Sequence, residues 1–322
     1  MADTIKKHPK IVCLGGGIGT VQVIRAIRPF ATDITVVVSM ADDGGSAGRL
    51  RRLYSVPPPG DLINCLAALS DAEPILKQLL TYRLEGNRWG NENSIEGHKI
   101  GNLILVALTK ILGDFNKALL EAERIFSCKG KILPSTFENV SIYAQTTKGE
   151  EVMGEETIDL GIYKDSLYRV FIKPNNVQTP IEVVGAINEA DFIIVGPGDL
   201  YTTILPVLLV PDIQKALDSS GAQKVFVTNI ANKRETKGYT IDQHLESIQR
   251  HAPYLKFDYI LINNNNKPPL SSQSSYEYID PRFKSAQKYT NILHADIIDE
   301  KFPIQHDIHK LGKIIYNKII NK

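Results

Sequence analysis

The feature that most constrains the fold is an apolar run near the start of the chain that ends in three consecutive glycines. Residues 11–14 form the run, and the glycines occupy positions 15–17. Apolar residues then recur at helical spacing over residues 20–27, and residues 34–38 are a second β-rich run of the kind that parallel sheets bury on both faces. Strand, loop, helix and strand within about 30 residues predict one unit of a parallel α/β sheet.

Later segments extend this unit into a larger sheet. We expect further strands at residues 192–195, 224–230 and 257–262, and helices at 61–71, 98–112, 114–127, 180–189 and 307–320. Residues 140–172 alternate in short runs that predict antiparallel strands. The predicted fold class is α/β, with a doubly wound, mostly parallel sheet and a small antiparallel extension. We treat residues 1–322 as one domain, with a nucleotide-binding half at 10–135, the β extension at 136–175 and a C-terminal half at 176–322.

Composition limits the class of protein. The net charge is +1, with 43% hydrophobic and 23% charged residues, which favours a packed core and argues against nucleic-acid or membrane partners. The chain has only three cysteines, an odd number that fits a reducing compartment rather than a disulfide framework. Residues 1–10 lack the apolar region of a signal peptide. We therefore expect a cytoplasmic location.

The glycine loop is the first candidate site. Gly16, Gly17 and Gly19 lie between a predicted strand and a predicted helix, where backbone can approach a ligand and free N–H groups can bind phosphate. Ile18 and Thr20 complete the loop. It is not the dinucleotide fingerprint, because Thr20 stands where that pattern requires glycine. A tight turn without a ligand remains the alternative.

A second candidate follows the second predicted strand and comprises Asp42, Asp43, Gly44, Gly45, Ser46 and Arg49. A carboxylate at this place in such a unit commonly meets a ribose hydroxyl, and paired acids also suit Mg²⁺. The guanidinium of Arg49 suits phosphate oxygens. The alternative is a polar turn that leads into a solvated basic helix.

Three further groups of polar residues complete the candidates. Asp61 begins a predicted helix, as a cap or a site residue, and Asn64 lies one turn later. His98 and Asn102 share one helix face. The loop after the strand at 192–195 supplies Gly196, Gly198, Asp199, Tyr201 and Thr202, at the sheet edge where α/β proteins bind ligands. A rigid loop entering a helix is the alternative for this last group.

Taken together, these segments resemble a known superfamily. Residues 15–20, 41–49, 58–66, 97–102 and 196–203 match, in order and spacing over about residues 10–265, the superfamily of 2-phospho-L-lactate transferases (CofD-like) and bacterial gluconeogenesis factors (YvcK-like). The segments at 41–50 and 58–66 look most like the gluconeogenesis-factor branch. The resemblance implies a Rossmann-like sheet with helices on both faces. It also implies a cytoplasmic protein that binds UDP-sugars and acts in gluconeogenic growth, cell shape and envelope-precursor supply.

The sequence departs from that branch at two presumed ligand contacts. Ile18 stands where the branch commonly has threonine, and Gln305 stands where it often has arginine. A hydroxyl and a guanidinium are thereby lost, which puts the ligand's identity and affinity in question.

Two functions remain open at this stage. The leading hypothesis is a regulatory protein that binds a UDP-sugar and acts through a protein partner. In it the glycines cradle the diphosphate, Asp42 or Asp43 meets the ribose or sugar, and Asp199 and Asn229 close the pocket. The alternative is a transferase that moves a phospholactyl-type group from a nucleotide diphosphate donor, with Asp42, Asp43 and Asp199 as catalytic candidates and Mg²⁺ held by the acidic pair. The sequence leaves the oligomeric state open, a homo-oligomer included.

Overall fold

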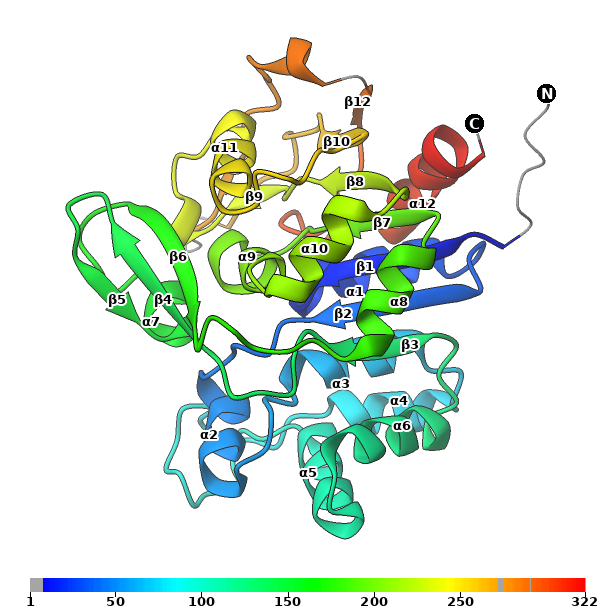
Figure 1. Ribbon diagram of the computed structural model, residues 1–322, viewed down its shortest axis with the longest axis vertical. Helices are drawn as coiled ribbons and strands as arrows, with labels where there is room; N and C mark the ends of the chain where they lie inside the picture. The colour runs from blue at the N-terminus through cyan, green and yellow to red at the C-terminus, as the bar shows by residue number, and fades with distance from the viewer. Residues whose placement is uncertain (1–7, 272–274, 290, 322) are drawn as a thin grey trace.

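The central element is a parallel sheet of seven strands. The computed structural model describes residues 8–271, 275–289 and 291–321, so residues 1–7, on which the signal-peptide argument partly rests, lie outside it. The strands are β1 (Lys10–Gly15), β2 (Asp33–Val38), β3 (Lys131–Pro134), β7 (Phe192–Val195), β8 (Gln223–Val227), β10 (Tyr259–Asn263) and β12 (Asn291–Ala295). Their order is β12-β10-β8-β7-β1-β2-β3, and every neighbouring pair is parallel (Figure 1). The predicted fold class is confirmed.

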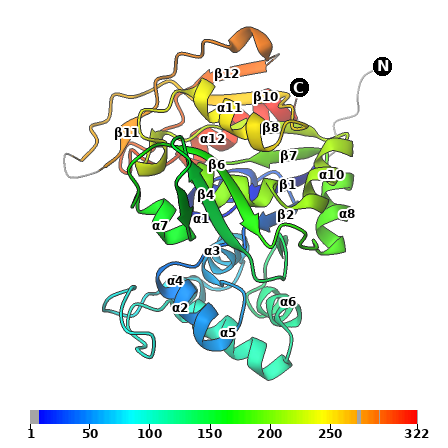
Figure 2. The same cartoon turned by 60° about the vertical axis from the view of Figure 1, so that its left-hand side comes forward.

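Helices cover both faces of the sheet. The α-helices of the described residues, some of which lie outside these two layers, are α1 (Gly17–Ile27), α2 (Gly45–Tyr54), α3 (Gly60–Leu69), α4 (Pro74–Thr81), α5 (Ile100–Leu112), α6 (Phe115–Ile125), α7 (Glu155–Asp159), α8 (Ile181–Glu189), α9 (Leu205–Leu208), α10 (Pro211–Ser219), α11 (Ile241–His251) and α12 (Ile308–Ile315). Helix α1 packs against α3 and α12, whereas α8 packs against α10 on the other face (Figures 1 and 2). Among the described residues, no helix is long and apolar enough to cross a membrane.

The chain reverses its direction across the sheet next to β1. From β1 it proceeds outward through β2 to β3, and later returns to pair β7 with the other side of β1 before continuing to β8, β10 and β12. The loops after β1 and β7 therefore diverge from neighbouring strands at a topological switch point, where open α/β sheets bind ligands.

The antiparallel extension is also confirmed. Strands β4 (Ser141–Thr146), β5 (Glu151–Met153) and β6 (Leu167–Lys173) form a separate sheet of order β5-β4-β6. It stands beside the carboxyl ends of the parallel strands (Figure 2). Two short strands, β9 (Ala231–Asn232) and β11 (Glu277–Tyr278), form a further antiparallel pair.

The burial of β1 and β2 confirms the two strands predicted from the first apolar runs. In β1 every residue from Ile11 to Gly15 is buried, and β2 has the same pattern from Ile34 to Val38. Cys13 and Cys65 are buried free thiols. Sequence reasoning did not identify β3, β12 or the helices α4, α10 and α11. The two strands are short and lie at the sheet edges, where the apolar signal is weak.

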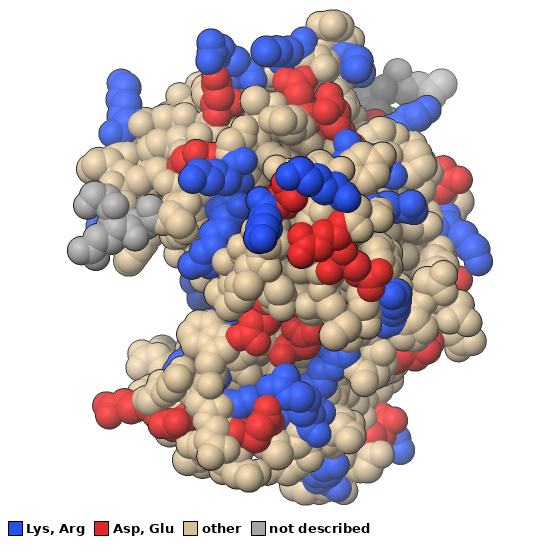
Figure 3. Space-filling view, turned by 90° about the vertical axis from the view of Figure 1, so that its left-hand side faces the viewer, with Lys and Arg blue, Asp and Glu red and all other residues tan. Residues whose placement is uncertain are grey.

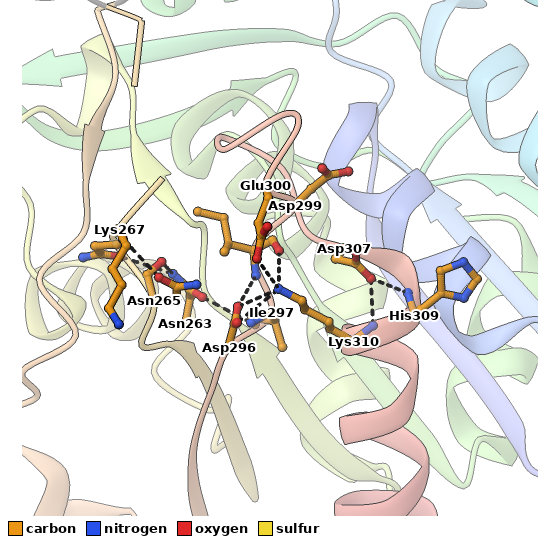
Figure 4. A network of polar contacts seen from close by, with 12 residues as sticks. Asn263, Asn265, Lys267, Asp296, Ile297, Asp299, Glu300, Asp307, His309 and Lys310 are labelled. Atoms are coloured by element: carbon orange, nitrogen blue, oxygen red, sulfur yellow. Dashed lines mark hydrogen bonds and ion pairs between the residues drawn. The ribbon is translucent and has the colours of Figure 1, made fainter. Parts of the chain in front are cut away.

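A polar network closes the C-terminal corner of the molecule (Figure 4). The side chain of Asn263, at the end of β10, accepts a hydrogen bond from the backbone N–H of Ile297 at 3.3 Å. Lys310 forms an ion pair with Asp296 at 3.1 Å, and Asp307 caps α12 by accepting from the backbone N–H groups of His309 and Lys310. These contacts join the last strand and the last helix to the carboxyl edge of the sheet.

Candidate functional site

A cavity of about 590 Å³ lies at the switch point. Its walls come from the loops after β1, β2, β7 and β8, from α3 and α5, and from the segment before α12. Figure 3 shows that this face of the molecule is hollowed between an upper and a lower part, with acidic and basic side chains beside the hollow. Predicted site residues on its wall are Gly16, Gly17, Ile18, Gly19, Asp42, Gly44, Ser46, Asp61, Asn64, Asn102, Gly198, Asp199 and Asn229.

The glycine loop presents backbone to the cavity. Gly17 has φ +65°, a conformation that L side chains rarely adopt, and a Cβ built on it would meet no atom within 4 Å. Helix α1 begins at Gly17 and has no side-chain cap at Gly16. Its first-turn N–H groups therefore lack helical partners and can meet an anion. Thr20 lies behind this surface, because its hydroxyl accepts the Gly16 N–H at 2.8 Å.

Asp61 already occupies part of this helix N-terminus. It lies in the first turn of α3, whose N-cap is Pro59, so it does not cap its own helix as the sequence had suggested. Instead it accepts a hydrogen bond from the backbone N–H of Gly17. A Cβ on Gly16 would lie 2.4 Å from its carboxylate oxygen, so a larger residue there would require the Asp61 side chain to move.

The switch-point loops are locked together by close backbone contacts. A Cβ on Gly19 would lie 2.4 Å from the carbonyl oxygen of Pro197, which requires glycine at that point. Asn229 fixes the second loop, because its amide accepts from the Gly198 N–H at 2.9 Å and donates to the Gly198 carbonyl at 2.8 Å. Asn229 therefore orients a wall of the cavity as well as lining it.

Buried carboxyl groups gather beside the glycine loop. Burial and the neighbouring Asp61 raise the pKa of Asp42 to about 7. Burial and Asp42 raise the pKa of Glu155, on α7, to about 10. Asp43 points elsewhere, because its carboxylate accepts the backbone N–H of Glu156 at 3.1 Å. The two adjacent acids therefore do not converge on the cavity. Among the described residues, no three Asp, Glu, His or Cys side chains are grouped as a metal site.

Cationic side chains that the sequence analysis did not select also line the cavity, namely Arg83, Arg88, Lys99 and Lys233. Lys233 bridges Asp199, at 3.0 Å, and Asp159 of α7. Lys99 donates to the Asn64 side chain at 2.6 Å. Isolated lysines and arginines carry no motif, so only the tertiary arrangement brings them to one place.

The structure contradicts the sequence prediction that Arg49 faces a ligand. Its side chain is only 2% exposed and does not reach the cavity wall. It donates instead to the backbone carbonyls of Asn91 at 2.7 Å, Ser94 at 3.1 Å and Glu96 at 2.5 Å. The guanidinium holds the 91–96 loop and is not available to a phosphate.

Other predicted residues are engaged in the protein interior. Tyr201 is fully buried and shares hydrogen bonds with Tyr239 at 2.9 Å and Ser247 at 3.2 Å, away from the cavity wall. His98 bonds the Ser46 hydroxyl at 2.8 Å, and burial, with Arg49 and Arg83 nearby, lowers its pKa. Gly45 and Gly196 also lie off that wall, each with a positive φ, of +47° and +71° respectively.

Thr202 occupies a smaller adjoining recess. This recess, of about 190 Å³, is also lined by Asp42, Asp61, Glu155 and Asp199. The Thr202 hydroxyl is buried and has no hydrogen-bond partner among the described residues.

The two positions that depart from the family pattern both line the cavity. The Ile18 side chain is 61% exposed there. Gln305 accepts a hydrogen bond from the Gln22 side chain at 2.7 Å. Substitutions at both positions therefore change the chemistry of the cavity wall itself.

The chain was compared with known proteins. Residues 11–302 match the model of the family "2-phospho-L-lactate transferase CofD". The gluconeogenesis factor of Bacillus subtilis is 37% identical over 318 residues, which cover 96% of this chain and 98% of that protein. The gluconeogenesis factor of Halalkalibacterium halodurans is 39% identical, with 96% of each chain covered. A crystal structure of a UPF0052 family member from Bacillus halodurans has a TM-score of 0.88 and 33% identity, and covers 97% of this chain and all of that one.

Proposed function

The chain belongs to the CofD family, with relatives named gluconeogenesis factor, and we propose that it is a regulatory protein that binds a UDP-sugar. We further propose that it acts in the cytoplasm, through a protein partner, in cell shape and envelope-precursor supply during gluconeogenic growth. The observation that carries the ligand proposal is the glycine loop. Its open backbone and the start of α1 face a cavity with cationic walls, which is the chemistry that a diphosphate requires.

In this proposal the ligand lies across the switch point. Gly17 and Gly19, with the first turn of α1, hold the diphosphate. Asp42 accepts hydroxyls of the ribose or the sugar. Asn229 and Tyr276, both on the wall formed by the C-terminal half, face the nucleoside. A tyrosine ring suits stacking against a base, and an amide suits its hydrogen-bonding edge.

The regulatory step would use the segment between α4 and α5. Arg88 of this segment lines both the cavity and its adjoining recess, and Trp89 lines the recess. Their side chains contact each other at 4.3 Å from cation to ring centre. A ligand that contacts Arg88 would favour one arrangement of this exposed segment. A partner protein that prefers this arrangement would then sense the ligand.

The first experiment is a calorimetric titration of the protein with UDP-N-acetylglucosamine. UDP, GDP and NAD serve as comparisons, each with and without Mg²⁺. We expect saturable binding of the UDP-sugar in preference to GDP and NAD. Equal affinity for all four nucleotides, or no binding, would contradict the proposal.

A second candidate function is a transferase that moves a phospholactyl-type group from a nucleotide diphosphate donor to an acceptor hydroxyl. The observation that favours it is the pair of carboxyl groups, Asp42 and Asp61, on the cavity wall. Mg²⁺ is often held by one or two carboxylates together with substrate phosphates, and these two residues suit that role. Preference for GDP that requires Mg²⁺ would favour this second function.

A further inference from the structure

One lobe of the cavity has a concentration of positive charge. Arg83, Arg88 and Lys99 line it on the side formed by α3, α5 and the segment between α4 and α5. Within the part of the chain that the structure describes, none of the three forms an ion pair. Arg83 donates to the Gly97 carbonyl at 2.6 Å, and Lys99 donates to the neutral Asn64 side chain.

These cations influence one another. Burial and then Arg83 lower the pKa of Lys99, and burial and then Arg88 lower the pKa of Arg83. Asp61 and Asp42 attract Lys99 and offset part of this effect. A desolvated cation whose pKa is lowered by neighbouring cations is stabilised when an anion binds beside it.

An independent observation comes from Asn102, on the α5 side of the same cavity. Asn102, in the first turn of α5, is 2% exposed and lines the cavity. Its Oδ1 atom is buried and has no hydrogen-bond partner among the described residues. A buried acceptor without a partner destabilises a protein, so such a group in a cavity wall indicates a partner on the ligand. A hydroxyl or amide beside an acid would supply that partner.

We infer that this lobe is a subsite for a second anionic group, so that the preferred ligand carries a carboxylate or phosphate in addition to the diphosphate. Arg83, Arg88 and Lys99 would bind the acid, and Asn102 would accept from a neighbouring donor. The inference rests on the proposed function, because the diphosphate is assigned to the glycine loop. The ligand is then either a nucleotide sugar whose sugar is acidic, or a neutral nucleotide sugar bound together with a free anion.

A matched pair of ligands tests the inference. UDP-glucose and UDP-glucuronate differ only by the replacement of a CH₂OH group with a carboxylate. At fixed ionic strength we expect UDP-glucuronate to bind at least tenfold tighter. If the anion is free in the cell, inorganic phosphate should instead tighten UDP-glucose binding. Equal affinities without any phosphate effect would overturn the inference.

The variant Lys99→Met identifies the group that the cations contact. It should weaken UDP-glucuronate at least tenfold, or abolish the phosphate effect, and weaken UDP less than threefold. Lys117→Met, on the exposed face of α6, is the control for a lost positive charge. An equal loss for UDP would show that the cations serve the diphosphate, and the inference would be wrong.

The anion subsite can be tested even if the proposed UDP-sugar binding fails. If no UDP compound binds, that function fails, and the subsite is tested with inorganic phosphate by itself. Phosphate binding that is lost in Lys99→Met but kept in Lys117→Met would support an anion subsite. No phosphate binding would overturn it.

Discussion

At the residue scale, Asp61 and Gly17 define how an anion can meet helix α1. The Asp61 carboxylate accepts from the Gly17 N–H and so occupies part of the positive end of the helix. Burial raises its pKa, although Lys99 and this hydrogen bond act in the opposite direction. A bound phosphate would meet the remaining N–H groups of the first turn. Glycine at position 17 keeps that approach open.

The first prediction concerns Gly17→Val. The new side chain would project into the cavity, and it would also strain a backbone with φ +65°. We expect UDP-sugar affinity to fall at least tenfold in calorimetry, with a loss of about 1–2 kcal/mol in the free energy of unfolding. Gly113→Val is the control, because Gly113 has φ +69° and open space but lies at the end of α5. If Gly113→Val lost the same UDP-sugar affinity, backbone strain and not a blocked cavity would explain the effect of Gly17→Val.

The second prediction concerns the pH dependence of Asp42. Its pKa is about 7 in the folded protein against an ordinary value of 3.8, with burial as the main cause. Between these values the folded protein holds a proton that the unfolded chain has lost, so stability falls as pH rises from about 4 to 7. Asp42→Asn should therefore raise the free energy of unfolding at pH 8 by about 1–3 kcal/mol and change it little at pH 4.

Urea unfolding at the two pH values measures this difference. Asp33→Asn is the matched control, because Asp33 is an exposed carboxylate at the start of β2. A gain of stability at pH 8 in the control, or none in Asp42→Asn, would contradict the prediction.

At the element scale, α2 supports the segment between α4 and α5. Arg49 projects from α2 and donates to three carbonyls of the 91–96 loop. Arg52, one turn further along, pairs with Glu92 of the same loop at 2.7 Å, but with both side chains well exposed. Both arginines therefore hold the same loop, but the buried Arg49 contributes more to the stability of the protein than the exposed Arg52.

The third prediction compares these two arginines. Arg49→Met removes a buried guanidinium that donates to three half-buried loop carbonyls, and should lower the free energy of unfolding by about 2–4 kcal/mol. Arg52→Met removes a surface ion pair and should lower it by less than about 1 kcal/mol. Hydrogen exchange of residues 87–97 should accelerate in the first variant only. Similar exchange in both variants would mean that Arg49 does not order the loop.

At the scale of the whole molecule, Lys233 joins three regions that are distant in sequence. It follows β9, and its ammonium contacts Asp199 of the switch-point loop and Asp159 of the helix beside the β extension. Burial lowers the pKa of Lys233, but the two carboxylates outweigh this effect and raise it. The pair of contacts holds the extension against the cavity.

The fourth prediction is that Lys233→Met destabilises the protein more at high pH. Asp199, whose side chain is 35% exposed, would keep its charge without its partner, and its pKa, already raised by desolvation, would rise further. The loss should be about 1–2 kcal/mol at pH 8, because solvent partly screens the pair, and smaller at pH 5, where the carboxyl groups take up protons more readily. Urea unfolding checks this, with exposed Lys237→Met as the control. An equal loss at both pH values would contradict an electrostatic role.

The sequence by itself determined the parallel sheet and the loops at its edge. Short apolar runs followed by glycine or paired acids are local patterns, and each one fixes a strand, its burial and the turn after it. The glycine loop, the turn at Asp42 and the loop at Asp199 were found in this way, and all three meet at the switch point.

Only the tertiary structure decided which side chains face the cavity. Arg49 was expected to face a ligand but binds carbonyls, whereas Lys99 and Lys233 were not selected and line the wall. A cation carries no local signal of its partner, because that partner comes from another element tens to hundreds of residues away. Asp61 likewise caps α1 rather than its own helix. Local chemistry fixes backbone conformation, but the packing of distant elements decides where each charge points.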